Sequence, residues 1–296
     1  MTEKPRGVHA RIVLELVNDF RMLKRDRVAL LGMIIVLSVL LVAILAPVVA
    51  PYNPYEMDLP NNRSPPSSKH LFGTDEFGRD LLSRILYGAT TSIQIGLVSV
   101  GIAMTTGILI GLIAGYFGGF TDSILMRIMD LLLAFPYILL SIVIVTMLGP
   151  GILNTMIAVG IRSIASFARV MRGSVLSVKE DYYIKAARAV GASDTRIVFR
   201  HILPNAISPS IVLGTLDLGS AILSAAALGF LGLGAQPPTP EWGLMLSNGR
   251  EYLIGSPHMV IFPGLAIMVT VLGFNLIGDW LRDMQDPRLR ERISYA

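Results

Sequence analysis

The sequence contains no cysteine, so disulfide bonds, thiolate metal centres and a thiol nucleophile are all excluded. Charge is scarce as well: 16% of the 296 residues are Asp, Glu, Lys or Arg, whereas a soluble domain carries roughly 25%. Hydrophobic residues make up 53% of the chain. A soluble globule of this size would expose too much apolar surface, and a disordered chain would have far less. This composition disfavours both classes and favours a membrane protein.

Sequence signatures of catalysis are also missing. No lysine follows a glycine, so the chain has no G-x-x-x-x-G-K-[ST] phosphate loop, and the H-E-x-x-H and G-x-S-x-G patterns do not occur. The four histidines do not have the spacing of zinc ligands. We therefore predict no enzyme activity, no metal site and no bound cofactor in this chain.

Long apolar runs are what the sequence has instead. Six stretches have the length of a membrane helix: 28–50, 92–117, 124–148, 152–170, 207–233 and 259–281. The first, at about 1.5 Å per residue, reaches roughly 34 Å and would cross a hydrocarbon core of about 30 Å. A cleaved signal is the alternative for it, but Pro51 follows where cleavage would be expected. We predict an all-α integral membrane protein with six transmembrane helices.

The positions of the 25 Lys and Arg residues predict the orientation of these helices. Twenty of them lie before the first apolar stretch, after the last one, or in and around two connections, the one between the second and third stretches and the one between the fourth and fifth. The remaining five are Arg63, Lys69, Arg79, Arg84 and Arg250. Because cytoplasmic segments are enriched in basic residues, both termini are predicted to be cytoplasmic. Residues 8–27 have helical apolar spacing with a basic opposite face, which predicts a helix on the inner membrane surface, with a frayed tail as the alternative.

Small and charged residues inside the apolar stretches are candidates for helix packing and for a polar site within the membrane. Gly107, Gly111 and Gly115 recur every four residues, a spacing that lets helices approach closely. We expect packing within this chain, with a subunit interface or a sliding translocation seam as the alternative. Arg162 and Asp217 form a possible intramembrane polar site, since charged residues in a span usually face protein or water.

Two further carboxylates, Asp122 and Asp130, lie near the second connection between stretches. They could form a proton relay, but pairing with Arg127 is the expected arrangement because the three residues are close in sequence.

The most informative segment is residues 179–205, KEDYYIKAARAVGASDTRIVFRHILPN, between the fourth and fifth stretches. Residues 181–190 are good helix formers, and Gly191 is a natural helix end. Ser193 can begin a second short helix that stops near Pro204. A loop that only joined two spans would be far shorter, so this segment is predicted to be a docking surface for a soluble partner.

From Lys185 to Pro204 this segment resembles the E-A-A loop of binding-protein-dependent ABC importers. In that family the loop forms the coupling helix, which sits in a groove of the ATPase subunit. The resemblance implies that the coupling residues here are Lys185, Ala186, Ala187, Gly191, Ala192, Ser193, His201, Leu203 and Pro204. Lys185 departs from the pattern because the family usually has Glu there, which puts in doubt an acid-dependent contact at that position.

Three other segments are similar to those of peptide and nickel permeases: HLFGTDEFGRD at 70–80, FLGLG with QPPTP at 230–240, and DPRLR at 286–290. Together with the early apolar stretch, they identify the chain as a member of the C-type permease subunits of dipeptide and oligopeptide systems. Arg162 departs from this family, which more often has a small or uncharged residue there. The resemblance covers nearly the whole chain and implies the type I ABC importer permease fold.

The resemblance also implies the domain organisation. A tail, the first span and an external loop occupy residues 1–87. A five-helix core occupies 88–284 and contains the coupling loop 171–206, and a cytoplasmic tail occupies 285–296. The external loops could touch a partner or simply cap the bundle.

The implied partners are a second homologous permease, two ABC ATPase subunits that hold ATP and Mg, an extracytoplasmic solute-binding protein and membrane lipid, without nucleic acid. The implied location is a bacterial or archaeal plasma (inner) membrane. A di- or oligopeptide is the expected substrate, with a nickel chelate or a glutathione-like solute as the alternative.

Three other classes are weighed against this hypothesis. An ion-driven secondary transporter would use Asp217 or Asp130 as its ion site, but the sequence has no inverted halves. An integral-membrane enzyme would need clustered catalytic residues, which the sequence does not show. An ABC exporter would not share the importer motifs.

Overall fold

The structure, a computed structural model, describes residues 26–285, and these residues are helical apart from their connections. The helices are α2 (Arg27–Val49), α3 (Leu81–Phe117), α4 (Gly119–Ala134), α5 (Tyr137–Leu148), α6 (Ile152–Lys179), α7 (Tyr182–Ala189), α8 (Asp194–Ile197), α9 (Leu203–Ala206), α10 (Ser208–Phe230), α11 (Trp242–Gly249) and α12 (His258–Gln285). Within 26–285 the only extended pairing is an isolated bridge between Thr74 and Asp80. The predicted surface helix of the N-terminal tail falls almost entirely outside the described residues, and the DPRLR segment falls wholly outside them.

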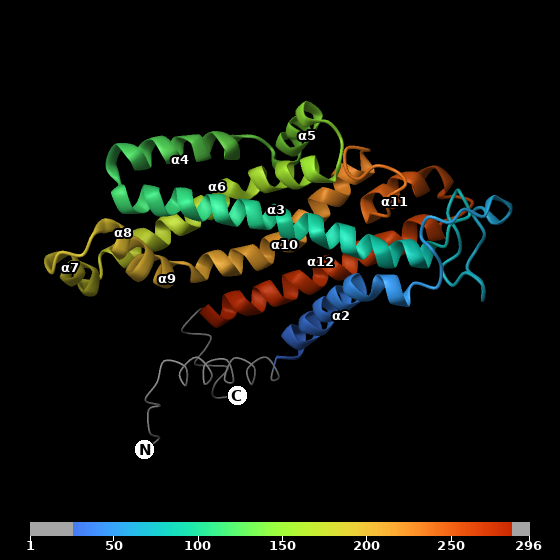
Figure 1. The fold of residues 1–296 in the computed structure, drawn as a ribbon, viewed down its shortest axis with the longest axis horizontal. Coiled ribbons are helices and arrows are strands. Elements are labelled where there is room, and N and C mark those ends of the chain that lie inside the picture. Colours follow the sequence, from blue (N-terminus) through green and yellow to red (C-terminus); the bar gives the residue numbers. More distant parts are fainter. Residues whose placement is uncertain (1–25, 286–296) are drawn as a thin grey trace, which may run out of the picture.

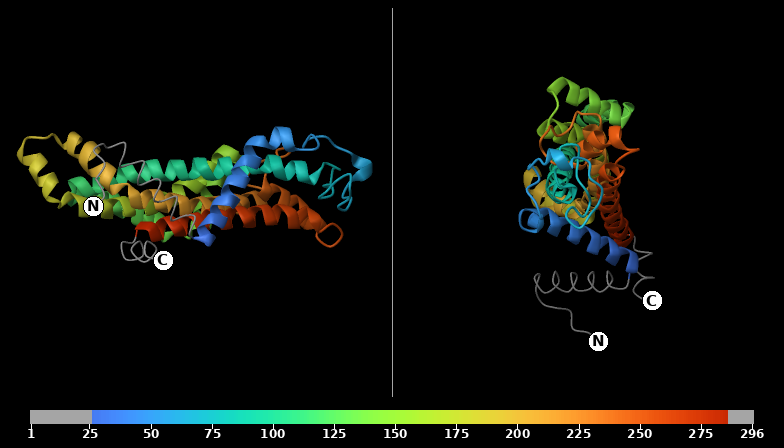
Figure 2. Two further views of the ribbon diagram at one scale, coloured as in Figure 1. Left: turned by 90° about the horizontal axis from the view of Figure 1, so that it is seen from below. Right: turned by 90° about the vertical axis from the view of Figure 1, so that its right-hand side faces the viewer.

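The long helices run along one axis of an elongated molecule (Figure 1). The 37-residue α3 packs along α6 and against α10, while α2 lies against α12 (Figure 2). The longer connections gather at two opposite ends, while the short ones on either side of α5 lie near the middle (Figure 1). We call residues 50–80 with 231–257 the loop end, and residues 179–206 the α7 end.

Four of the described helices, α2, α3, α10 and α12, are long and apolar enough to cross a membrane. The third predicted stretch is instead two helices, α4 and α5, which meet at 95° and make a fifth span if counted together. Pro136 explains this break, because the residue before a proline disfavours helical backbone, and Phe135 is extended. The fourth predicted stretch lies in α6, whose apolar character is reduced by Arg162 and Arg169.

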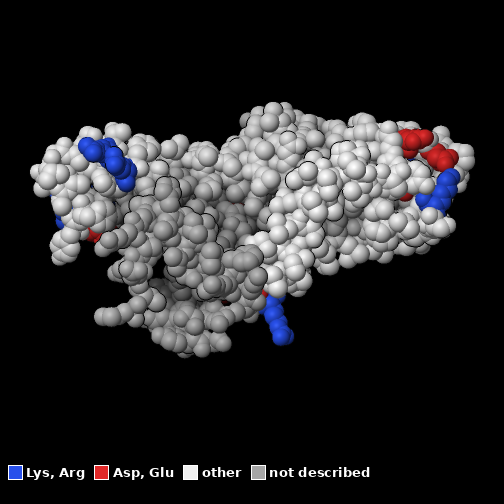
Figure 3. Space-filling view, turned by 60° about the horizontal axis from the view of Figure 1, so that its bottom comes forward, with Lys and Arg blue, Asp and Glu red and all other residues white. Residues whose placement is uncertain are grey.

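The outer surface of the bundle is apolar. Exposed hydrophobic side chains line α2 and the α4–α5 pair, for example Leu41, Ile44, Phe120, Leu131 and Met147. On the face shown in Figure 3, the charged side chains of the described residues lie near the two ends and at one place near the lower middle, and the remaining white surface is largely free of charge. An apolar outer surface of this kind is typical of a protein surrounded by lipid.

A buried ionic cluster holds the loop end together. Arg84 and Arg79 both contact the carboxylate of Asp75, with Nε–Oδ2 distances of 3.2 and 2.6 Å. Glu76 accepts from Arg79 at 3.3 Å and from the Asn248 amide at 3.1 Å, so the cluster joins the two loops. Burial raises the pKa of Glu76 above its ordinary value. The motif at 70–80 is thus a structural element of the loop end.

Two capping carboxylates fasten the same loops to α3. Asp80 caps α3 by accepting from the Ser83 backbone amide at 2.8 Å, and its other oxygen lies 2.9 Å from His70 Nδ1. Glu241 caps α11 by accepting from the Gly243 and Leu244 amides, both at 2.8 Å, and it also accepts from the Ser92 hydroxyl of α3 at 3.2 Å. Burial raises the pKa of Glu241. Both caps anchor the start of a helix while tying the loops to α3.

Candidate functional site

The α7 end is built from short helices with separate start and stop signals. The helix predicted for 181–190 is confirmed as α7, and Gly191 follows with φ +83°, a backbone conformation that favours glycine. The second predicted helix begins at Ser193, whose hydroxyl accepts from the Arg196 amide at 3.4 Å. Its predicted stop near Pro204 is wrong. The chain continues through a π-helical turn, Val198–Ile202, into α9, where Pro204 occupies the first turn and needs no amide donor.

An apolar face anchors this segment to the ends of α3 and α6. The side chains of Ile184, Ile197 and Ile202 are almost completely buried. They pack in one cluster with Met171 and Val175 of α6 and with residues from the end of α3. Burying a side chain of this size contributes about 1.5–3 kcal/mol, so the α7 end is held in a defined position.

The predicted coupling residues divide between this anchor and the outer surface. Ala187, Ala192 and Leu203 are partly buried against the apolar cluster, and His201 is partly buried in the π-helical turn. The others, Lys185, Ala186, Gly191, Ser193 and Pro204, are exposed. Tyr182 and Val190 are 90% and 85% exposed at the two ends of α7. The structure therefore brings the set into one segment with an anchored side and an open side, while its docking role stays a prediction.

A polar contact that the sequence did not reveal centres on Tyr116, at the end of α3. Its hydroxyl donates to the Asp194 carboxylate and accepts from Arg188 Nη2 at 3.1 Å, and its carbonyl accepts from Lys179 Nζ at 2.5 Å. The bond to Tyr116 raises the pKa of Arg188 above its ordinary value. Tyr116 thus links α3 to α6, α7 and α8 at one point. No local pattern indicates this link, since Tyr116 precedes Arg188 by 72 residues.

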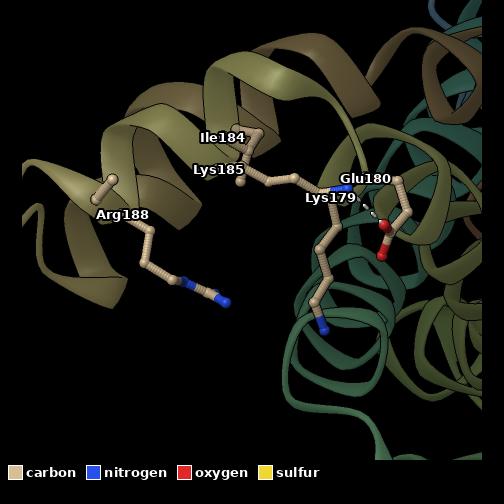
Figure 4. Close-up of a pocket in the computed structure, with 6 residues that line it drawn as sticks. Lys179, Glu180, Ile184, Lys185 and Arg188 are labelled. Atoms are coloured by element: carbon tan, nitrogen blue, oxygen red, sulfur yellow. Dashed lines mark ion pairs between the residues drawn. The ribbon is translucent and has the colours of Figure 1, made fainter.

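Lys179 and Arg188 help to line a pocket of about 370 Å³ at the base of α7 (Figure 4). Lys185, the residue that departs from the E-A-A pattern, lines the same pocket, and its ammonium lies 3.1 Å from the Glu180 carboxylate (Figure 4). Both partners are exposed, Lys185 by 58% and Glu180 by 74%. An exposed pair of this kind contributes little to stability, so Lys185 is available for contact with another molecule.

Two ion pairs join α4 to α6. The Arg172 guanidinium contacts both oxygens of Asp122 at 2.5 Å, and Arg169 contacts Asp130 at 2.6 Å. The predicted pairing of these carboxylates with Arg127 is therefore wrong. Helix packing, which brings α4 alongside α6, decided the partners instead of proximity in sequence.

The two charged residues of the predicted intramembrane site lie together. Arg162 of α6 and Asp217 of α10 form an ion pair, with Nη2 3.2 Å from Oδ1. The Arg162 guanidinium also lies 5.3 Å from the ring centre of Tyr137, the first residue of α5. Asp217 is thus not the isolated carboxylate that an ion-driven transporter would offer.

The three glycines of α3 line its contact with α6. A Cβ on Gly107 would lie 2.5 Å from the Cβ of Phe167, and one on Gly115 would lie 2.8 Å from the Cβ of Val175. Gly111 faces the backbone of Ala168 in the same seam. Since real Cβ atoms do not approach so closely, any larger residue here would push α3 and α6 apart.

Comparisons with known proteins fit this architecture. Residues 107–291 match the family described as the binding-protein-dependent transport system inner membrane component. The chain belongs to this family. Residues 18–66 match the N-terminal TM domain of oligopeptide transport permease C. The chain is a component of an ABC transport system and a multi-pass membrane protein.

Several curated relatives are similar over most of their length. A dipeptide transport system permease protein of Alkalihalophilus pseudofirmus is 49% identical over 92% of this chain and 89% of its own. A glutathione transport system permease protein of Escherichia coli is 48% identical over 92% of this chain and 90% of its own.

Among solved structures, a chain of the MetNI methionine ABC transporter, in inward-facing conformations, matches with a TM-score of 0.55 and 19% identity. The match covers 70% of this chain and 98% of that one. This likeness shows that the two chains share the permease fold.

Proposed function

We propose that the chain is the transmembrane permease subunit of an ATP-driven importer of di- or oligopeptides. The anchored α7 with its open outer side carries this proposal, because it offers a rigid element that a soluble subunit can push or pull. The substrate class rests on two relatives named for dipeptide and glutathione transport, each 48–49% identical. Both substrates are short peptides, which places a glutathione-like solute within the same chemistry. A nickel chelate is the less favoured cargo.

The remaining subunits follow from this assignment. A second homologous permease completes the pathway, an extracytoplasmic binding protein delivers the solute to the loop end, and two ATPase subunits hold ATP and Mg. The chain itself performs no covalent chemistry and binds no cofactor. It crosses the plasma membrane of a bacterium or archaeon six times, with α4–α5 and α6 each counted as a span and with both termini in the cytoplasm.

Transport then works by alternating access. ATP-driven closure of the ATPase dimer moves α7, and the Tyr116 link and the apolar anchor pass this displacement to α3 and α6. The tight seam at Gly107, Gly111 and Gly115 makes α3 and α6 move together. The helices thereby switch between access from the binding protein and access to the cytoplasm.

Deleting residues 186–191 in the complete transporter tests this proposal. Substrate-stimulated ATPase activity, measured with the binding protein in proteoliposomes, is expected to disappear while the subunits still copurify. Ala186→Trp, which adds bulk to the exposed side of α7, should have the same effect without removing residues. Ile44→Trp, a change at an exposed apolar position of α2 away from both ends, is the control. Undiminished stimulation in assembled complexes carrying either α7 change would overturn the proposal.

A further inference from the structure

The Arg162–Asp217 pair lies deep between the two ends of the bundle. Arg162 is about 15 Å along α6 from its start at Ile152, and Asp217 is about 14 Å along α10 from its start at Ser208. Two charges near the middle of a hydrocarbon layer are costly and usually face a polar pathway or a functional partner.

The pair is incompletely bonded. It has one contact of 3.2 Å, whereas Arg172 and Asp122 share two contacts of 2.5 Å. Arg162 Nε and Asp217 Oδ2 are buried and have no partner at hydrogen-bond distance and angle among the described residues, and the Ser163 hydroxyl is the one further group that interacts with the Asp217 carboxylate there. The side chains of Arg162 and Asp217 are only 10% and 15% exposed, so bulk water does not readily supply the missing bonds. Unsatisfied buried groups of this kind call for a functional explanation.

The two free atoms have opposite preferences. Arg162 Nε is a donor of the guanidinium cation and can bind a carboxylate. Asp217 Oδ2 is an acceptor of a carboxylate anion and can bind an ammonium group. A molecule with both groups close together, such as a short peptide with free termini, satisfies both at once. An extended dipeptide spans roughly 7 Å, short enough to replace the direct Arg162–Asp217 contact without separating the helices far.

We propose that Arg162 and Asp217 form a transient subsite for the charged termini of a short peptide in transit. The substrate carboxylate binds Arg162, the substrate ammonium binds Asp217, and the ion pair forms again when the peptide leaves. This proposal rests on the proposed import function and specifies the substrate chemistry. A site of this kind favours free short peptides over peptides with blocked termini.

Cysteine protection in the complete transporter tests the subsite. Because the chain contains no cysteine, Ser166→Cys and Ile161→Cys each provide a reporter in this subunit. Both positions are partly buried, and position 166 lies one helical turn from Arg162. L-alanyl-L-alanine is expected to slow maleimide labelling of at least one reporter, whereas its N-acetylated and C-amidated forms should protect roughly tenfold less well, or not at all. The double change Arg162→Gln with Asp217→Asn should abolish protection.

Equal protection by free and blocked peptides would overturn the subsite, and so would protection that persists in the double variant. Absence of labelling at both reporters in a complex that still transports would also overturn it, because the subsite requires an accessible pathway. Uptake of L-alanyl-L-alanine separates the two proposals. If the wild-type complex does not take up the peptide, the proposed substrate class fails. If uptake is normal in both the wild type and the double variant, only the subsite fails.

Discussion

The two ends of the molecule use charge in opposite ways. At the loop end, Arg79 and Arg84 are each 2% exposed and share the Asp75 carboxylate. At the α7 end, the Lys185–Glu180 pair is largely exposed, and basic side chains reach the surface (Figure 3). Buried charges in a low-dielectric interior require partners, whereas exposed charges are solvated and screened.

The loop end is therefore a rigid cap of the helix bundle, whereas the α7 end has a surface that another molecule can contact. The loop end joins two loops and the starts of α3 and α11 through interlocked hydrogen bonds. The α7 end depends on an apolar anchor and on the contacts of Tyr116. Buried ion pairs thus specify the structure at the loop end, while the charged side chains at the α7 end lie mostly at the surface, where a partner can reach them.

The largest effect is expected from Arg84→Met, which tests the rigid cap. The change removes a buried cation, weakens the neutralisation of Asp75 and leaves the Pro54 carbonyl without the donor that lies 2.8 Å away. Breaking a buried ion pair from one side costs about 3–5 kcal/mol. Thermal unfolding of the purified complex should show a clearly lowered midpoint. Arg196→Met, an exposed change at the α7 end, is the control and should cost less than about 0.5 kcal/mol. Equal effects of the two changes would contradict the comparison.

An intermediate effect is expected from Tyr116→Phe, which tests the hydroxyl contacts of Tyr116 at the α7 end. The change removes the hydroxyl shared by Asp194 and Arg188 but keeps the buried ring. The expected loss of stability is about 1 kcal/mol. The stronger consequence should be reduced substrate stimulation of the ATPase, with basal ATPase activity and assembly retained. Tyr183→Phe on α7 is the matched control and should leave stimulation unchanged. Full stimulation in Tyr116→Phe would show that the hydroxyl is not needed, and that the apolar anchor with the Lys179 bond to the backbone carbonyl of residue 116 transmits the movement.

The features that the sequence predicted correctly are local ones. Helix α7, its end at Gly191 and the cap at Ser193 each depend on residues within a few positions of one another. The features it missed depend on contacts between distant segments. Asp122 pairs with Arg172 instead of Arg127 because α4 packs beside α6, and Tyr116 meets Asp194 only after the chain has turned back on itself. The motif at 70–80 was visible, but its role in a buried ionic cluster required Arg84 and Asn248 from other elements.

The smallest effect on stability is expected from Lys185→Glu, which tests whether the open surface is electrostatically tuned. The ion pair with Glu180 would become a like-charge contact, but because both side chains are exposed, the free energy of unfolding should change by less than about 0.5 kcal/mol. Binding of the ATPase subunits should change far more, since the charge on the outer side of α7 is reversed, and the difference from wild type should shrink at high salt. Copurification of the ATPases across a salt series measures this. Lys69→Glu, the same change at an exposed position of the loop end, should alter neither quantity. If Lys185→Glu and Lys69→Glu behave alike, charge on α7 has no part in docking, and contact there depends on shape and apolar surface alone.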